Sequence, residues 1–168
     1  VSESEQHILR DIRQLFAIIQ ADQRLSVPAR ALLSYLQLPY SRIALHDAEF
    51  FTDEKNLAKS VLNEAVRLAA SWQPNSEQLA LDPFCKKLCE IVTTFWEAER
   101  VGQIPYQQML FDLLLYGESE RQLQQVTSQR FQESQQGAMQ ASLIREQVDA
   151  LVAAKLQGIA VPIAVNQL

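Results

Sequence analysis

The sequence predicts an all-α protein, an irregular multi-helix bundle with a long C-terminal helix. Apolar residues recur at every third or fourth position along most of the chain, which is the spacing of one helix face. Residues 118–157 contain no proline and a single glycine, which is long for one helix of a globular protein. We therefore expect a helical bundle over 4–116, a glutamine-rich helix over 118–157 and an extended tail over 158–168 that leads into further sequence.

Two apolar stripes predict the first two helices. The first helix runs from about Ser4 to about Ala21, after acidic residues that suit a helix N-terminus. The second follows Ser26 with Pro28 in its first turn, where proline is favoured. It should end near Gln37, because the next proline is poorly tolerated inside a helix. The residues of the two stripes are Ile8, Leu9, Ile12, Leu15, Phe16, Ile19, Ala29, Leu32, Leu33 and Leu36.

A short helix and an aromatic loop are predicted after this second helix. Pro39 opens the short helix, and the loop covers residues 47–53. The loop contains Phe50 and Phe51, and both are expected to anchor it to the core, since an aromatic side chain can bury roughly 150–250 Å². The residues expected to be buried in the short helix are Ile43, Ala44 and Leu45.

Two further helices have clear start and stop signals. Asn56 is a good N-cap for the first of them, which the polar segment 73–76 should end. Asp82 is the expected cap of the second, which starts at Pro83 and should end near Gly102. The residues of the two inner faces are Leu57, Val61, Leu62, Ala65, Leu68, Trp72, Phe84, Leu88, Ile91, Val92, Phe95 and Trp96.

The last part of the bundle leads into the long helix. Pro105 should open an apolar helix that stops near Gly117. The long helix follows over 118–157, and Gly158 is its expected C-cap. The apolar residues of the helix after Pro105 are Met109, Leu110, Phe111, Leu113, Leu114 and Leu115.

The long helix is the feature that we predict to be functional. Its centre is rich in glutamine, and apolar spacing returns at Ile144, Val148 and Leu151, which are the predicted interaction residues. A helix with a polar middle either bridges packed ends or pairs with another chain. One interpretation is an exposed helix that contacts a second subunit or a neighbouring domain. The other is a helix that packs across the bundle with its glutamines outward.

Composition argues against several classes of function. The formal net charge is −5 at pH 7, whereas non-specific nucleic-acid binding needs a basic face. Four glycines are too few for a glycine-rich phosphate loop. No apolar run approaches the roughly 18 residues that a membrane-spanning helix needs. We expect a cytoplasmic protein with no nucleic-acid, membrane or cofactor partner.

Two histidines are candidates for chemistry, and both are better explained as structural. His46 and Asp47 could form a base and its orienting partner, but adjacent residues on a helix do not face each other. A histidine at a helix C-terminus is favourable in itself. His7 has one potential metal ligand a turn away, Glu3, and a metal site needs more. We predict no catalytic and no metal-binding residues.

Cys85 and Cys89 are the only cysteines. Because they are four residues apart on a predicted helix, they share one face, and a disulfide between them would be strained. They could supply two zinc ligands, but no second pair of Cys or His completes a set of four. We expect two buried free thiols.

One segment resembles a known family. The residues that carry the resemblance are Leu36-Gln37-Leu38-Pro39, Ala44-Leu45, Asp47, Phe50-Phe51, Leu62-Asn63 and Trp72. They are similar to the bacterial domain-of-unknown-function 1631 family, whose members are sometimes labelled thymidine phosphorylase. The match is best over 32–72 and departs at Asn56-Leu57, where the family commonly has a histidine and a proline. The resemblance implies a segment of a long bacterial protein, and some relatives end in a domain that resembles the cyclic-di-GMP-binding PilZ type.

These observations predict a non-catalytic interaction or regulatory segment of a larger bacterial protein. We expect it to bind a protein partner or to dimerise through its long C-terminal helix. The alternative is a small-ligand sensor or an enzyme fragment with a pocket between helices near Tyr40, Arg42 and Trp72. That alternative could be linked to cyclic-di-GMP signalling through a further C-terminal domain.

Overall fold

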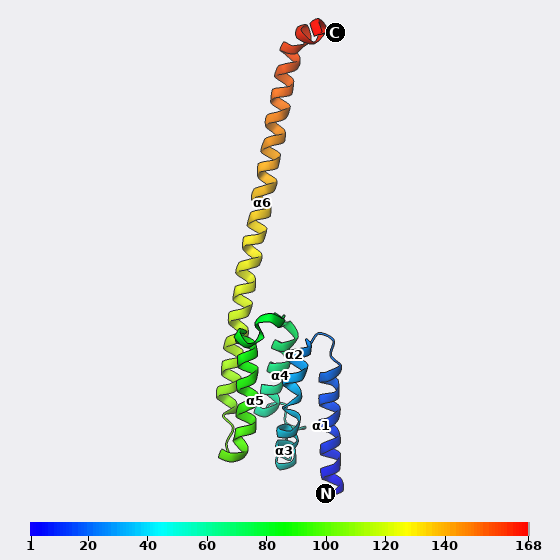
Figure 1. Cartoon of the computed structure of the whole chain (residues 1–168), viewed down its shortest axis with the longest axis vertical. Coiled ribbons are helices and arrows are strands. Elements are labelled where there is room, and N and C mark those ends of the chain that lie inside the picture. The colour runs from blue at the N-terminus through cyan, green and yellow to red at the C-terminus, as the bar shows by residue number, and fades with distance from the viewer. Residues whose placement is uncertain (168) are drawn as a thin grey trace. The chain divides into compact units, whose positions relative to one another are not determined.

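The computed structural model describes the backbone of residues 1–167 and the side chains of 1–98 and 102–156. Across this part of the chain the structure is all-α without strands, which confirms the predicted fold class and the long C-terminal helix (Figure 1). The chain divides into two compact units, Val1–Glu118 and Ser119–Leu168. The elements are α1 (Glu3–Ala21), α2 (Val27–Ser34), α3 (Gln37–His46), α4 (Leu57–Ser71), the 3-10 helix η1 (Ser76–Leu81), α5 (Pro83–Val101) and α6 (Tyr106–Gln167).

Side-chain caps begin α4 and α5 where the sequence predicts them. The Oδ1 atom of Asn56 accepts a hydrogen bond from the amide of Lys59 at 3.1 Å. Asp82 Oδ1 accepts from the amides of Phe84 and Cys85 at 2.8 and 3.0 Å. Helix N-termini leave amides without intrahelical partners, so these two side chains set where each helix begins.

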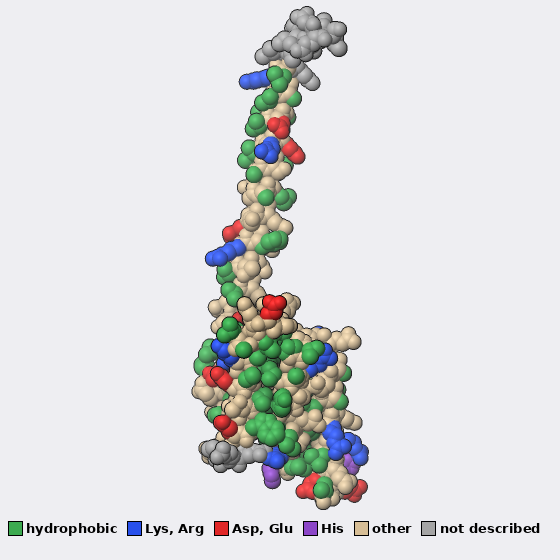
Figure 2. All heavy atoms as spheres, in the orientation of Figure 1, with side chains coloured by type: hydrophobic (Ala, Val, Ile, Leu, Met, Phe, Trp, Pro, Cys, Tyr) green, Lys and Arg blue, Asp and Glu red, His purple; other side chains and the backbone are tan. Residues whose placement is uncertain are grey.

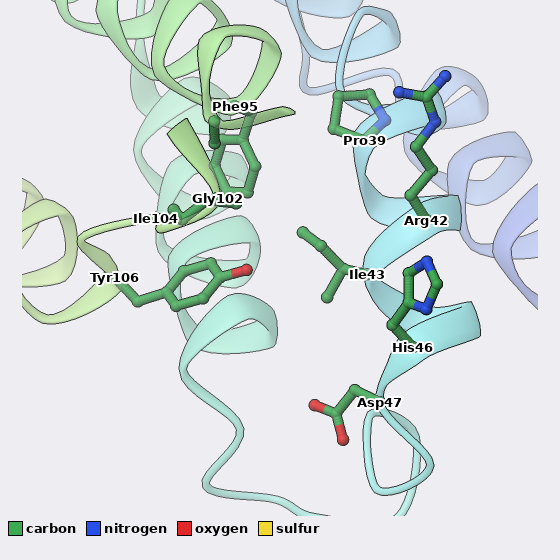
Figure 3. A pocket seen from close by; sticks show the side chains of 10 residues that line it. Pro39, Arg42, Ile43, His46, Asp47, Phe95, Gly102, Ile104 and Tyr106 are labelled. Carbon is green, nitrogen blue, oxygen red and sulfur yellow. The ribbon is translucent and has the colours of Figure 1, made fainter. Parts of the chain in front are cut away.

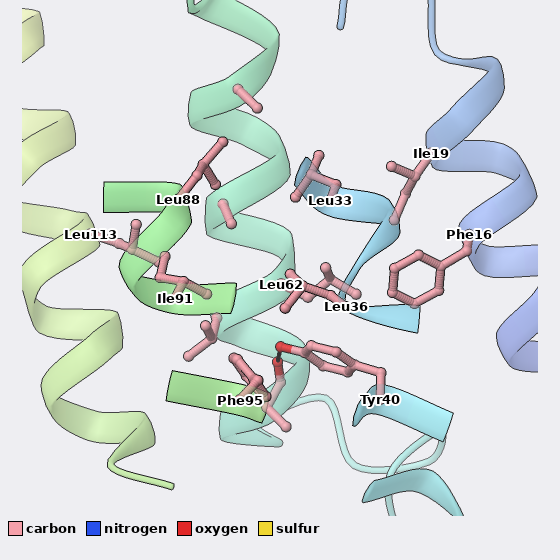
Figure 4. Close-up of a cluster of buried hydrophobic side chains, with 14 of the residues drawn as sticks. Phe16, Ile19, Leu33, Leu36, Tyr40, Leu62, Leu88, Ile91, Phe95 and Leu113 are labelled. Carbon is pink, nitrogen blue, oxygen red and sulfur yellow. Dashed lines mark hydrogen bonds between the residues drawn. The ribbon is translucent and has the colours of Figure 1, made fainter. Parts of the chain in front are cut away.

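The core of the first unit is built around Tyr40, which has no exposed surface (Figure 4). Its ring centroid lies 6.2 Å from that of Phe16, 6.1 Å from that of Phe50 and 5.0 Å from that of Phe95. Its hydroxyl donates a 2.6 Å hydrogen bond to the carbonyl oxygen of Ala58. Burial raises the pKa of Tyr40 well above its ordinary value. The bond lets the polar end of this side chain lie inside an apolar core.

The boundary between α2 and α3 lies earlier than predicted. The helix α2 ends at Ser34 rather than near Gln37, and α3 begins at Gln37, two residues before Pro39. Proline is tolerated there because the amides of a first helical turn have no intrahelical acceptor. Pro39 therefore belongs to the first turn of α3 without being its first residue.

The predicted burial after Pro39 is wrong in three places. In α3, Ala44 is buried, but Ile43 and Leu45 are only half-buried. In the following loop, Phe50 is 1% exposed, whereas Phe51 is 39% exposed and contacts the Phe50 ring edge-on at 5.0 Å. Adjacent side chains leave the backbone in different directions, so only one of the two phenylalanines reaches the core.

The predicted helix stop at Gly117 is also wrong, because α6 passes through this residue. A Cβ atom at Gly117 would lie 3.0 Å from Cδ2 of Leu68 and 3.1 Å from Nη2 of Arg67, both on α4. The glycine thus permits a close approach of two helices, which is a different use of this residue from a C-cap. The prediction at Gly102 is confirmed: it has φ +80° and its amide donates to Ala98 at 2.7 Å.

The end of α6 also differs from the prediction. The helix continues through Gly158 to Gln167. The sequence predicts instead that it ends at Gly158 and that 158–168 form an extended tail. The side chains of 157–168 lie outside the described residues. No helix of the described residues is long and apolar enough to cross a bilayer.

Candidate functional site

The three predicted interaction residues form an uncovered apolar stripe on the second unit. Ile144, Val148 and Leu151 are 59%, 50% and 66% exposed. Their spacing of four and then three residues places them on one face of α6, and we call them the α6 stripe. Taken by itself, this unit exposes every described side chain from Arg121 to Leu156. Within its own unit the stripe is therefore uncovered.

The pocket predicted near Tyr40, Arg42 and Trp72 does not form from these three residues. Tyr40 is buried in the core. The indole nitrogen of Trp72 donates to both carboxylate oxygens of Asp82 at 3.1 Å, so this side chain supports the cap of α5. Arg42 does line a cavity. The sequence places the three residues on neighbouring helices but gives no signal of the direction in which each side chain points.

Arg42 lines a cavity of about 410 Å³ between α3, α5 and the segment that precedes α6. Figure 3 shows Ile43, Phe95 and Tyr106 directed toward the space in its middle. Burial, and then the nearby carboxylate of Asp47, raises the pKa of Tyr106. The lining residues are Pro39, Arg42, Ile43, His46, Asp47, Phe95, Ala98, Gly102, Ile104 and Tyr106.

Asp47 makes its hydrogen bonds at the junction between α3 and α4. Its Oδ1 accepts from the amide of Glu49 at 3.0 Å, and its Oδ2 accepts from the side-chain amide of Asn56 at 2.8 Å. It also follows the last residue of α3, which is His46. Asp47 thereby ties the end of α3 to the start of α4, and both of its oxygens are engaged outside any imidazole–carboxylate pair.

A second concave surface lies along α2 and α5, and sequence reasoning missed it. Figure 2 shows hydrophobic side chains gathered in a strip over the face where these two helices lie side by side in Figure 1. The hollow has a volume of about 500 Å³, and we call it the α2/α5 groove. Its lining residues are Leu32, Tyr35, Cys89, Val92, Thr93, Trp96 and Glu97.

Two aromatic residues give the α2/α5 groove its character. Tyr35 is 58% exposed and Trp96 is 38% exposed. The indole N–H of Trp96 donates to the carbonyl oxygen of Tyr35 at 2.9 Å, which joins the two helices at this point. Sequence periodicity assigns Trp96 to the inner face of α5, where it is counted as core. Only the packing of α2 against α5 shows that the ring borders an open groove.

Comparison with known proteins identifies the family of this chain. The matching family model is described as "Protein of unknown function (DUF1631) 2nd domain", and it covers residues 1–99, more than half of the 168 residues. The chain belongs to the DUF1631 family. No curated protein and no solved structure matches it. The resemblance over 32–72 is confirmed and extends from the first residue to the last turns of α5.

The residues matched by the DUF1631 second domain include the α2/α5 groove but not the α6 stripe. All residues of the α2/α5 groove lie between 32 and 97, inside the match over 1–99. The α6 stripe lies beyond it. The cavity beside Arg42 is divided, since Ile104 and Tyr106 follow the matched segment. The groove is thus a surface of the family domain itself.

The cysteines of this DUF1631 domain differ from the prediction of two buried thiols. Cys85 is buried, and Cys89 is exposed in the α2/α5 groove. Burial, followed by the neighbouring Cys89, raises the pKa of Cys85. Within the described part of the chain, no group of three or more His, Cys, Asp and Glu side chains could hold a metal ion.

Proposed function

We propose that this DUF1631 segment is a protein-interaction module that self-associates through the α6 stripe. The observation that carries the proposal is the exposure of Ile144, Val148 and Leu151, each at least half exposed on one helix face. Removing apolar surface from water contributes about 25 cal/mol per Å², so three such side chains favour association. Contiguous exposed apolar surface of this kind is typical of interaction sites.

The residues around the stripe also support association. The charged side chains Arg145, Glu146, Asp149 and Lys155 alternate with the apolar ones. Side chains of both signs around an apolar face keep a helix soluble before it meets its partner and restrict which partners fit. Most helical stability in proteins comes from packing of an amphipathic face rather than from propensity, so a partner that covers the stripe would further stabilise α6.

The oligomeric state tests this proposal. We expect a dimer by light scattering at micromolar concentration, and a monomer for the double variant Val148→Glu, Leu151→Glu. Two carboxylates introduced into an apolar contact would have to be desolvated, which opposes association. A wild-type monomer over the whole accessible concentration range would contradict the proposal.

A matched control separates the stripe from the added charge. Ser142→Glu with Ala153→Glu introduces the same two charges on the opposite face of α6, eleven residues apart, or about three turns. Both positions are exposed. This control should remain dimeric. If it dissociates as fully as the stripe variant, net charge rather than the stripe governs association.

A second candidate function is binding of a small ligand in the cavity beside Arg42. The specific observation is a volume of about 410 Å³ that combines apolar walls with Arg42, His46 and the hydroxyl of Tyr106. A guanidinium beside aromatic walls suits a planar organic anion. Fluorescence titration with anilinonaphthalene sulfonate should show saturable binding that Arg42→Ala weakens and Arg30→Ala, on α2, does not. Equal binding by all three proteins would contradict this candidate.

A further inference from the structure

We propose that the partner of the α6 stripe is the α2/α5 groove of a second copy of this chain. The inference depends on the proposed self-association and specifies its contact. The stripe of each copy would insert between α2 and α5 of the other, in the way that an amphipathic helix lies in a groove. Association would then bring the second unit of one copy onto the family domain of its partner.

The groove has the chemistry that an apolar helix face requires. Its walls are formed mainly by Leu32, Tyr35, Val92 and Trp96. Aromatic residues of this kind are enriched where binding free energy is concentrated. The hydrogen bond from the Trp96 indole to the Tyr35 carbonyl, at 2.9 Å, holds the ring in place before any partner arrives. A fixed ring loses little conformational freedom on binding, which favours affinity.

The two surfaces agree in length. Along α5 the groove extends from Cys89 to Glu97. Along α6 the stripe extends from Ile144 to Leu151. The two spans are eight and seven residues, or about 12 Å and about 10 Å at the helical rise of about 1.5 Å per residue. Three apolar side chains, spaced four and three residues apart, would therefore occupy most of the groove.

The charges at the ends of the two surfaces are complementary. Among the described residues that line the groove, one is charged, and it is the exposed Glu97 beside Trp96. On α6, Arg145 follows Ile144, and Lys155 lies one turn beyond Leu151. A basic side chain thus flanks each end of the stripe. Whichever way the docked helix runs, one cation comes close to Glu97, and opposite charges at the rim help to set the register.

Reciprocal docking also explains why the assembly would stop at two copies. In a two-fold arrangement each copy supplies one stripe and one groove, so both apolar surfaces of both copies are covered and no further copy can add. Two such contacts bury twice the area of one, which brings a small groove closer to the 1,200–2,000 Å² or so of a stable interface. The expected species is therefore a dimer that does not grow with concentration.

A groove variant tests the inference against the stripe variant of the same full chain. Tyr35→Glu places a charge on a groove residue that is 58% exposed, and Ile18→Glu places one on an apolar residue of α1 that is 69% exposed and does not line the groove. We expect Tyr35→Glu to raise the dimer Kd by about thirtyfold or more, as loss of a central interface residue does. Ile18→Glu should leave the Kd unchanged. Circular dichroism of each variant verifies the fold.

The outcomes separate this inference from the proposed function. If the stripe variant dissociates while Tyr35→Glu remains dimeric, the stripe pairs with another surface, such as a second α6, and the inference is wrong while self-association stands. If the stripe variant has no effect, both are wrong. If both variants dissociate and Ile18→Glu does not, both are supported.

The exposed thiol in the groove provides a direct second test. Cys89 would be covered by the docked helix, while Cys85 is already buried. We would mix a copy that keeps Cys89 with a copy carrying Cys89→Ala and Gln147→Cys, whose new thiol lies beside the stripe. Mild oxidation should produce a disulfide-linked dimer between the two kinds of copy. Moving the introduced thiol to Ser142, on the opposite face of α6, should abolish the link. Equal linking from both positions, or none from Gln147→Cys, would overturn the inference.

Discussion

In the first unit, Phe16 and Leu62 are 1% exposed, whereas in the second unit Phe131 and Leu151 are 63% and 66% exposed. All four are large apolar side chains on helices. In the first unit several helices supply faces that cover one another around Tyr40. The second unit, taken by itself, is a stretch of one helix, so no other element of that unit covers its apolar face. Apolar side chains on helices therefore form a core in one region and an open surface in the other.

The comparison shows what helical periodicity does and does not predict. Periodicity marks an apolar face, and burial of that face at about 25 cal/mol per Å² stabilises whichever contact covers it. Whether the covering element belongs to the same chain depends on the rest of the fold. In the second unit we propose that a second copy covers it. The contribution of the stripe residues to stability should then depend on protein concentration. The contribution of core residues should not.

The largest expected effect compares two phenylalanines. Phe16→Ala should reduce the free energy of unfolding of the first unit by about 3–5 kcal/mol, because it removes a buried ring and leaves a cavity. Phe131→Ala should change it by less than about 0.5 kcal/mol, as exposed substitutions do. Both tryptophans, Trp72 and Trp96, lie in the first unit, so denaturant titration followed by tryptophan fluorescence measures that unit. Similar losses for the two variants would remove the distinction between the units.

A smaller effect compares two glycines of α6. Gly117→Val should destabilise the first unit by about 1–3 kcal/mol, because the new side chain meets Leu68 and Arg67 at contact distance. At Gly137 nothing lies within 4 Å of a Cβ atom, and a Val there should leave stability unchanged or slightly raised. Thermal unfolding followed by circular dichroism provides the measurement. A loss at Gly137 as large as that at Gly117 would show that the second unit also has a packed partner at this position.

The smallest effect concerns the hydroxyl of Tyr40. Tyr40→Phe should cost about 0.5–1.5 kcal/mol near pH 7, since it removes the hydrogen bond to Ala58 and keeps the ring. Burial raises the pKa of Tyr40, so above pH 10 or so the unfolded chain releases a proton that the folded chain retains. Stability should therefore fall as the pH rises through this range.

The alkaline loss of stability belongs to the first unit alone. All four tyrosines, at positions 35, 40, 106 and 116, precede its end at Glu118. The pKa of Tyr106 is raised too, so Tyr40→Phe should flatten the pH dependence without removing it. Urea titrations between pH 8 and 11 would measure this slope. An unchanged slope in Tyr40→Phe would mean that Tyr40 keeps its ordinary pKa.

Local signals predicted the helix boundaries best. Asn56, Asp82 and Gly102 act at the positions that capping chemistry indicates, because a cap bonds only to residues within one turn of itself. Signals whose meaning depends on distant residues were misread. Gly117 reads as a helix stop in sequence, but it serves the contact with α4. The pair Phe50-Phe51 reads as two anchors, and only one of them faces the core.

The candidate surfaces also differ in whether the sequence predicts them. The α6 stripe is visible in sequence because its three residues belong to one helix and follow its period. The α2/α5 groove is not, because its halves are separated by more than fifty residues and meet only when α2 packs against α5. The cavity beside Arg42 likewise combines α3 with the segment before α6.

The sequence by itself determined the all-α class, the capped starts of α4 and α5, and the stripe on α6, since each follows from interactions within a few residues along the chain. The tertiary structure decided that Tyr40 lies in the core, that Gly117 lies inside a helix, and that Tyr35 and Trp96 border a groove. Those properties depend on the direction of side chains relative to other helices, and that direction is set only when the helices pack.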